Sequence, residues 1–102
     1  MTLEDLGRRA VACKHWRWME GMQVEPLRFR VVWLTEDMIG ESDQVSYFWK
    51  NVPDLYPDLS DPATLGCLLA LVREAWKGNV APVYPDSDEA LAKLVAALEA
   101  AP

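Results

Sequence analysis

The first stretch of the chain carries apolar residues at helical spacing. The stripe consists of Leu3, Leu6, Ala10 and Cys13. The charged residues between them fall on the other faces, as in an amphipathic helix. Thr2 and Asp5 stand three residues apart, which is the spacing of a capping box at a helix start. We therefore expect a helix from about residue 3 to residue 13.

The hydrophobic period changes to two in the middle of the chain, which is typical of strands. The clearest strand is predicted over 27–34, LRFRVVWL. Its buried face would carry Phe29, Val31 and Trp33. Its other face would carry Arg28, Arg30 and Val32. A second strand over 45–50 would pair with it antiparallel across a polar turn centred near Gly40, and the alternation at 16–18 could add a third.

The second half of the chain predicts two further helices. After a proline- and aspartate-rich loop over 51–62, Ser60 or Asp61 can cap a helix that has Pro62 at its first position and ends at Gly78. We expect this central helix to be buried, with four side chains nearly inaccessible to solvent: Leu68, Leu69, Val72 and Trp76. A C-terminal helix is expected to start near Asp86 and to bury Leu91, Leu94, Val95 and Leu98.

These elements predict one α+β domain over residues 1–102. A small antiparallel sheet of two to three strands would pack against three helices. The length fits one domain, and a hydrophobic content of 51% is enough to build a core without disulfides or metal ions.

Charge and segment composition restrict the partners and the location. Ten basic residues against sixteen acidic ones give a net charge of −6, which makes nucleic acid an unfavourable partner. The N-terminus lacks the apolar region of a signal peptide, and the apolar stretch over 65–72 is too short to span a membrane. Cys13 and Cys67 are too few for a secreted disulfide framework and are expected to be reduced. We expect a cytoplasmic protein without a membrane partner.

Three segments resemble a family of short uncharacterised proteins encoded by tailed phages and prophages. They are LGRRAVACKHWRWMEGM (6–22), PDLSDPATLGCLLALVREAW (57–76) and LVAALEAAP (94–102). The central segment is the most specific of the three, and together they cover roughly half of the chain. The resemblance implies a phage origin and expression in a bacterial host, and it implies no catalytic residue or cofactor.

The residues give little support to catalysis or metal binding. His15 and Cys13 are two positions apart, so they do not face each other on a helix as a nucleophile and its base would. The spacing of Asp54, Asp58 and Asp61 is not that of a calcium loop, and the five glycines stand singly. We expect a non-enzymatic protein without cofactor or metal.

Two surfaces are candidates for binding a partner protein. The solvent face of the sheet would combine arginine with apolar side chains, as protein interfaces do: Arg28, Arg30, Val32, Ser46, Phe48 and Lys50. The acidic turn holds Glu36, Asp37, Glu41 and Asp43, which could meet a basic protein surface. A solvated sheet face explains the first equally well, and a solvated hairpin tip is the more common explanation of the second.

The function expected from these observations is protein binding by a phage accessory protein, with a host or phage protein as its partner. Antagonism of a host defence, such as a CRISPR effector, is the narrower form of this hypothesis. The alternative is a small structural or assembly protein, for example a homodimer through the arginine-bearing face. A small enzyme ranks below both.

Overall fold

The computed structural model describes residues 2–51, 54–79 and 84–102. In chain order its elements are α1 (Leu3–Val11), β1 (Gln23–Glu25), β2 (Phe29–Arg30), β3 (Trp33–Leu34), β4 (Met38–Gly40), β5 (Ser46–Phe48), η1 (Trp49–Asn51), β6 (Tyr56–Pro57), α2 (Pro62–Ala75) and α3 (Asp88–Ala100). The α+β class with three helices is therefore confirmed. The strands form two three-stranded antiparallel sheets in place of the one sheet expected.

The helix starts follow the capping chemistry of the sequence. Thr2 and Asp5 form the expected capping box at the start of α1. Asp61 caps α2 by accepting from the main-chain N–H of Thr64, with Pro62 at the first helical position. The cap of α3 is Ser87, whose hydroxyl accepts from the N–H of Ala90, so the expected start at Asp86 is one residue early.

The end of α2 differs from the prediction by one residue. Lys77, with φ 54°, occupies the left-handed position that usually follows the C-cap, and Gly78 comes after it. The N–H of Gly78 donates to the carbonyl of Arg73, and that of Lys77 to the carbonyl of Glu74, both at 3.0 Å. This pair of bonds is a Schellman motif with lysine where glycine is preferred.

The segment predicted as one strand over 27–34 supplies a strand to each sheet. Sheet A has the order β2-β1-β6, and sheet B has the order β3-β4-β5. The change of partner lies between Val31, whose N–H donates to the carbonyl of Met22, and Val32, whose N–H donates to that of Gly40. The prediction that 27–34 pairs with 45–50 is wrong, because β4 lies between β3 and β5.

The turn expected near Gly40 is a strand. Gly40 is the last residue of β4 and pairs with Trp33, whose indole ring lies against it. A Cβ at Gly40 would come within 2.1 Å of that ring, so glycine is required there by the close approach of the indole. The polar region between 35 and 45 is therefore divided into two turns at opposite ends of β4.

The core lies between sheet A, the inner side of sheet B and the three helices. Leu68 and Val72 of α2 are buried as expected, together with Phe29 and Val31. Leu69 and Trp76 are only half-buried, which corrects the predicted face of α2. Trp33 is also half-buried, because it lies on the far side of sheet B from Ile39 and the core.

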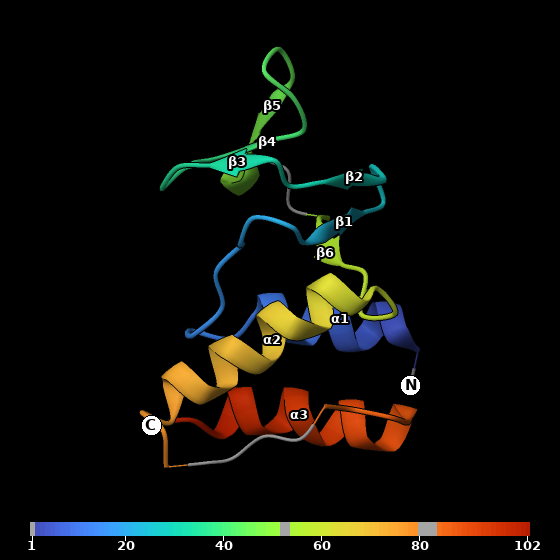
Figure 1. The fold of residues 1–102 in the computed structure, drawn as a ribbon, viewed down its shortest axis with the longest axis vertical. Coiled ribbons are helices and arrows are strands. Elements are labelled where there is room, and N and C mark those ends of the chain that lie inside the picture. The colour runs from blue at the N-terminus through green and yellow to red at the C-terminus, as the bar shows by residue number, and fades with distance from the viewer. Residues whose placement is uncertain (1, 52–53, 80–83) are drawn as a thin grey trace.

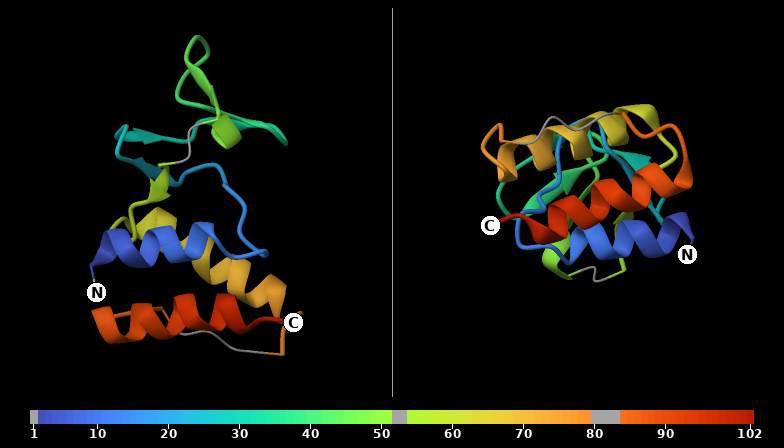
Figure 2. Two further views of the ribbon diagram at one scale, coloured as in Figure 1. Left: turned by 180° about the vertical axis from the view of Figure 1, so that it is seen from behind. Right: turned by 90° about the horizontal axis from the view of Figure 1, so that it is seen from below.

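The elements are stacked along the longest axis of an elongated molecule of 39 × 27 × 21 Å. Sheet B lies at one end, sheet A in the middle, and the helices at the other end, with α3 beneath α1 and α2 (Figures 1 and 2). Helix α1 packs closely on β6, and Gly7 permits this approach. A Cβ at Gly7 would lie 2.8 Å from the main-chain oxygen of Pro57. Sheet B is thus held away from the helices by sheet A.

Candidate protein-binding surface

The residues of the predicted arginine-bearing face do not share one surface. Arg28 lies in the turn between β1 and β2 with φ 57°, where it lines a hollow beside Glu25 and Tyr56. Arg30 belongs to β2 of sheet A, whereas Ser46 and Phe48 belong to β5 of sheet B. The alternation over 27–34 cannot show this, because the strand changes sheets halfway.

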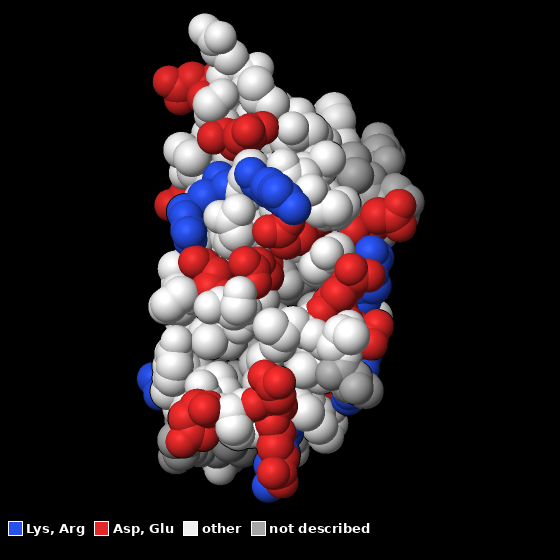
Figure 3. Space-filling view, turned by 90° about the vertical axis from the view of Figure 1, so that its right-hand side faces the viewer, with Lys and Arg blue, Asp and Glu red and all other residues white. Residues whose placement is uncertain are grey.

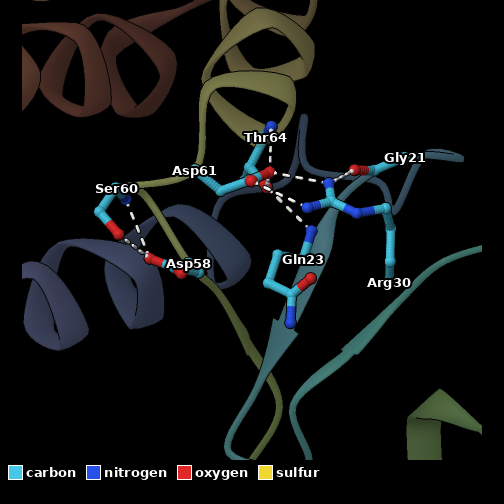
Figure 4. Close-up of polar contacts among 7 residues, drawn as sticks. All are labelled: Gly21, Gln23, Arg30, Asp58, Ser60, Asp61 and Thr64. Atoms are coloured by element: carbon cyan, nitrogen blue, oxygen red, sulfur yellow. Dashed lines mark hydrogen bonds and ion pairs between the residues drawn. The ribbon is translucent and has the colours of Figure 1, made fainter.

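Arg30 is engaged in a polar contact within the protein. Its guanidinium donates to both carboxylate oxygens of Asp61 at 3.0 Å and to the carbonyl of Gly21 at 2.6 Å (Figure 4). Asp61 also accepts from the N–H and hydroxyl of Thr64, and the Thr64 hydroxyl accepts from the N–H of Gln23 at 2.8 Å. We call Arg30, Asp61 and Thr64 the polar clasp. It joins both strands of the β1–β2 hairpin to the start of α2.

The outer face of sheet B is the observed surface that most resembles the exposed sheet face predicted from the sequence. Cross-strand register and alternation place five residues on it: Trp33, Met38, Gly40, Ser46 and Phe48. Phe48 is 54% exposed. Val32 and Val45, which flank strands of the same sheet, are exposed too. The other face of the sheet carries Leu34, Ile39 and Tyr47 and packs inward, with Tyr47 stacked on Phe29.

The predicted acidic residues are separated into two pairs. Glu36 and Asp37 lie in the turn between β3 and β4, and Glu41 and Asp43 lie in the loop between β4 and β5. The Lys50 ammonium of η1 lies 3.3 Å from a carboxylate oxygen of Asp37. The Tyr47 hydroxyl donates to Glu41, and this hydrogen bond raises the pKa of Tyr47. The acids therefore flank sheet B at both ends and do not form one patch.

A groove lined by three tryptophans lies on the inner side of sheet B. Its residues are Trp16, Arg17, Trp18, Leu34, Thr35, Glu36, Ile39 and Trp49, and we call it the tryptophan groove. Its volume is about 280 Å³. Trp16 and Trp18 meet edge to face at 5.4 Å, and the Trp49 indole N–H donates to the carbonyl of Glu36 at 3.2 Å. These contacts hold the three rings in place.

The indole N–H of Trp16 is buried and has no hydrogen-bond acceptor in the part of the chain that the structure describes. Most buried polar groups in proteins have a partner, so this one needs an explanation. The groove was not predicted from the sequence. The alternation of Trp16 and Trp18, with a third tryptophan after β5, is the only signal of it in the sequence.

The remaining reactive side chains are placed as structural groups. Cys13 and Cys67 are free and half-buried, and burial raises the pKa of both thiols. The Nε2 atom of His15 lies 3.3 Å from the carbonyl oxygen of Ala101. Among the described residues, no group of three or more acidic, histidine or cysteine side chains is placed to hold a metal ion.

Charges are mixed along the surface. On the side of the molecule drawn in Figure 3, acidic side chains extend along its whole height, and the basic ones lie beside them without forming a continuous stripe. Within the described ranges, no helix has the length and apolarity needed to cross a bilayer.

Comparison of the chain with protein-family models, with curated proteins and with solved structures finds no match. The candidate surfaces are therefore interpreted from their own geometry and chemistry.

Proposed function

We propose that the chain is a phage accessory protein that acts by binding another protein, and that the outer face of sheet B makes the contact. The observation that carries this proposal is the exposure of Phe48 on the sheet face that also carries Met38 and Trp33. Single exposed apolar residues are ordinary, but several apolar residues on one sheet face, two of them aromatic, are typical of interaction sites. The position of sheet B at one end of the molecule keeps this face clear of the helices (Figure 1).

The narrower form of the proposal is antagonism of a host defence, such as a CRISPR effector. Carboxylates at both ends of β4 flank the apolar face, and the net charge of −6 favours a basic partner surface. A protein surface that normally holds nucleic acid has this character. The alternative is a structural or assembly protein that forms a homodimer through the same face. The binding role does not require an enzymatic activity.

The test compares two exposed aromatic residues. Phe48→Asp places a charge on the outer face of sheet B, while Tyr84→Asp makes the same kind of change at a residue of similar exposure outside both sheets. We expect Phe48→Asp to weaken partner binding by about 2 kcal/mol or more, as loss of an interface anchor does. Tyr84→Asp should bind normally. Recovery of tagged variants with host proteins from infected cells, followed by titration of the purified partner, measures this.

The alternatives give different results in the same experiment. A dimer of the purified wild type that Phe48→Asp dissociates would favour the structural role. Restored phage growth on a host with an active CRISPR system, lost with Phe48→Asp and kept with Tyr84→Asp, would support antagonism. Equal partner binding by the wild type and both folded variants would rule out this face.

A further inference from the structure

We infer that the tryptophan groove is a second binding site, which takes an apolar side chain from a partner-protein segment that carries Lys or Arg next to that side chain. The inference rests on the proposed function only for the class of ligand, a protein. The site is distinct from the outer face of sheet B, since its residues come from the inner face, from the β3–β4 turn, from η1 and from the segment between α1 and β1.

The size and lining of the groove fit a side chain. Indole rings and the side chains of Leu34 and Ile39 make most of its wall. Pockets for small-molecule ligands usually span about 300–1,000 Å³, so a groove of about 280 Å³ is at the lower limit. It has room for one large apolar side chain or two small ones. Rigid aromatic walls favour such an anchor because few torsions must be fixed on binding.

The charges at the groove favour a basic segment. The guanidinium of Arg17 is neutralised by Glu74, whose two carboxylate oxygens lie at 2.8 Å from its nitrogens. Glu36 lines the groove, and Glu20 lines an open hollow that shares Trp18 and Leu34 with it. Within the described part of the chain, neither of these two exposed carboxylates has an ion-pair partner. The uncompensated charge at the rim is therefore negative.

The main chain along the groove has hydrogen-bonding capacity to spare. Arg17 and Trp18 lie outside helices and strands, and in the described structure no protein group bonds to their main-chain N–H or C=O. An extended segment in the groove supplies carbonyl and N–H groups to this edge, as in strand addition. This is the reason to prefer a peptide segment over an isolated apolar molecule.

The test uses a displayed library of random linear peptides as the probe, selected against the intact chain. We expect enrichment of peptides with a large apolar residue next to Lys or Arg. In titrations with the selected synthetic peptides, the indole N–H resonances of Trp16, Trp18 and Trp49 should shift. Trp33 lies on the outer face of sheet B, and Trp76 lies at the end of α2, where its indole donates to the carbonyl of Ala97 in α3. Both are outside the groove, so their resonances should stay in place and act as internal controls.

A charge-reversal pair of variants separates local from general electrostatics. The double variant Glu20→Lys, Glu36→Lys alters two exposed side chains, Glu36 in the groove and Glu20 in the adjoining hollow. We expect it to weaken the binding of the basic peptides by about tenfold, because like charges then meet at the rim of the groove. The matched double variant Asp54→Lys, Asp86→Lys makes the same change of net charge at exposed residues outside the groove and outside sheet B, and it should have little effect.

Four outcomes would overturn the inference: no enrichment of basic-apolar peptides, equal weakening by the two double variants, shifts at Trp33 without shifts at the groove, or self-association of the free protein that shifts the three groove indoles. The outcome is separate from that of the proposed function. Phe48→Asp should bind the selected peptides as the wild type does, so loss of the partner through Phe48 and loss of peptide binding through the groove are measured independently.

Discussion

Asp61 performs three roles with one carboxylate. It caps α2 through the N–H of Thr64, accepts from the Thr64 hydroxyl, and pairs with the guanidinium of Arg30 (Figure 4). The Arg30 hydrogen bonds, reinforced by those from Thr64, lower the pKa of Asp61 from 3.8 to about 2. Only 15% of the Asp61 side chain is exposed, against 48% for Arg30, so solvent screens the carboxylate only in part.

The polar clasp should make stability depend on pH in the acid range. Because the folded-state pKa of Asp61 lies below its unfolded value, its contribution is complete above about pH 4 and is lost as the pH falls towards 2. We expect the contribution to be about 2 kcal/mol near neutral pH. Urea unfolding of the wild type and of Asp61→Asn from pH 6 to about pH 2 measures it.

Asp61→Asn is an informative comparison because asparagine also caps helices well. The carboxylates of Glu74 and Glu99 have lowered pKa values too, through hydrogen bonds from Arg17 and Arg9, and they titrate in both proteins. The difference between the two proteins therefore reports Asp61. A stability difference that stays constant across the pH range would contradict the role assigned to its charge.

At the scale of the element, the end of α2 contains a local conflict between residue type and backbone. Lys77 has φ 54°, in the left-handed region that disfavours residues with a Cβ. We expect Lys77→Gly to raise the free energy of unfolding by about 0.5–1 kcal/mol, because the Schellman motif then has its preferred residue. The shift of the urea midpoint measures the change.

Gly78 provides the control for this prediction. It also has a positive φ of 78°, and among the described residues, its two chain neighbours aside, no atom lies within 4 Å of a Cβ built on it. Gly78→Ala should therefore destabilise the protein by about 1 kcal/mol through backbone strain alone. Stabilisation by Gly78→Ala, or destabilisation by Lys77→Gly, would show that the end of α2 has a different conformation.

At the scale of the whole molecule, helix α2 contributes one face to the common core. Leu68 is completely buried in the common core, whereas the neighbouring Leu69 is half-buried. Leu68→Ala should lower the free energy of unfolding by about 2–5 kcal/mol, and Leu69→Ala by less than half as much, because it removes less buried surface and leaves a smaller cavity. Urea unfolding of the two variants at one pH measures both.

The comparison of adjacent leucines removes most differences in helix propensity and unfolded-state behaviour. Equal losses from the two variants would mean that α2 is rotated relative to the described core. A larger loss from Leu69→Ala would restore the helix face expected from the sequence pattern.

The sequence by itself determined the helices, because their starts depend on residues a few positions apart. Thr2, Asp61 and Pro62 specify the starts of α1 and α2 within the chain's own local geometry. The α+β class followed from the same local patterns. Alternation also identified Phe29 and Val31 as buried, since side-chain direction along a strand is a local property.

Only the tertiary structure decided which strands pair and which surfaces they form. Val31 and Val32 are adjacent, yet the N–H of Val31 bonds to Met22, next to β1 of sheet A, and that of Val32 bonds to Gly40 in β4 of sheet B. Such pairing depends on how the whole chain packs, and alternation does not encode it. For the same reason, the pairing of Arg30 with Asp61, the position of Trp33 outside the core and the assembly of the tryptophan groove from three distant segments follow from the tertiary structure.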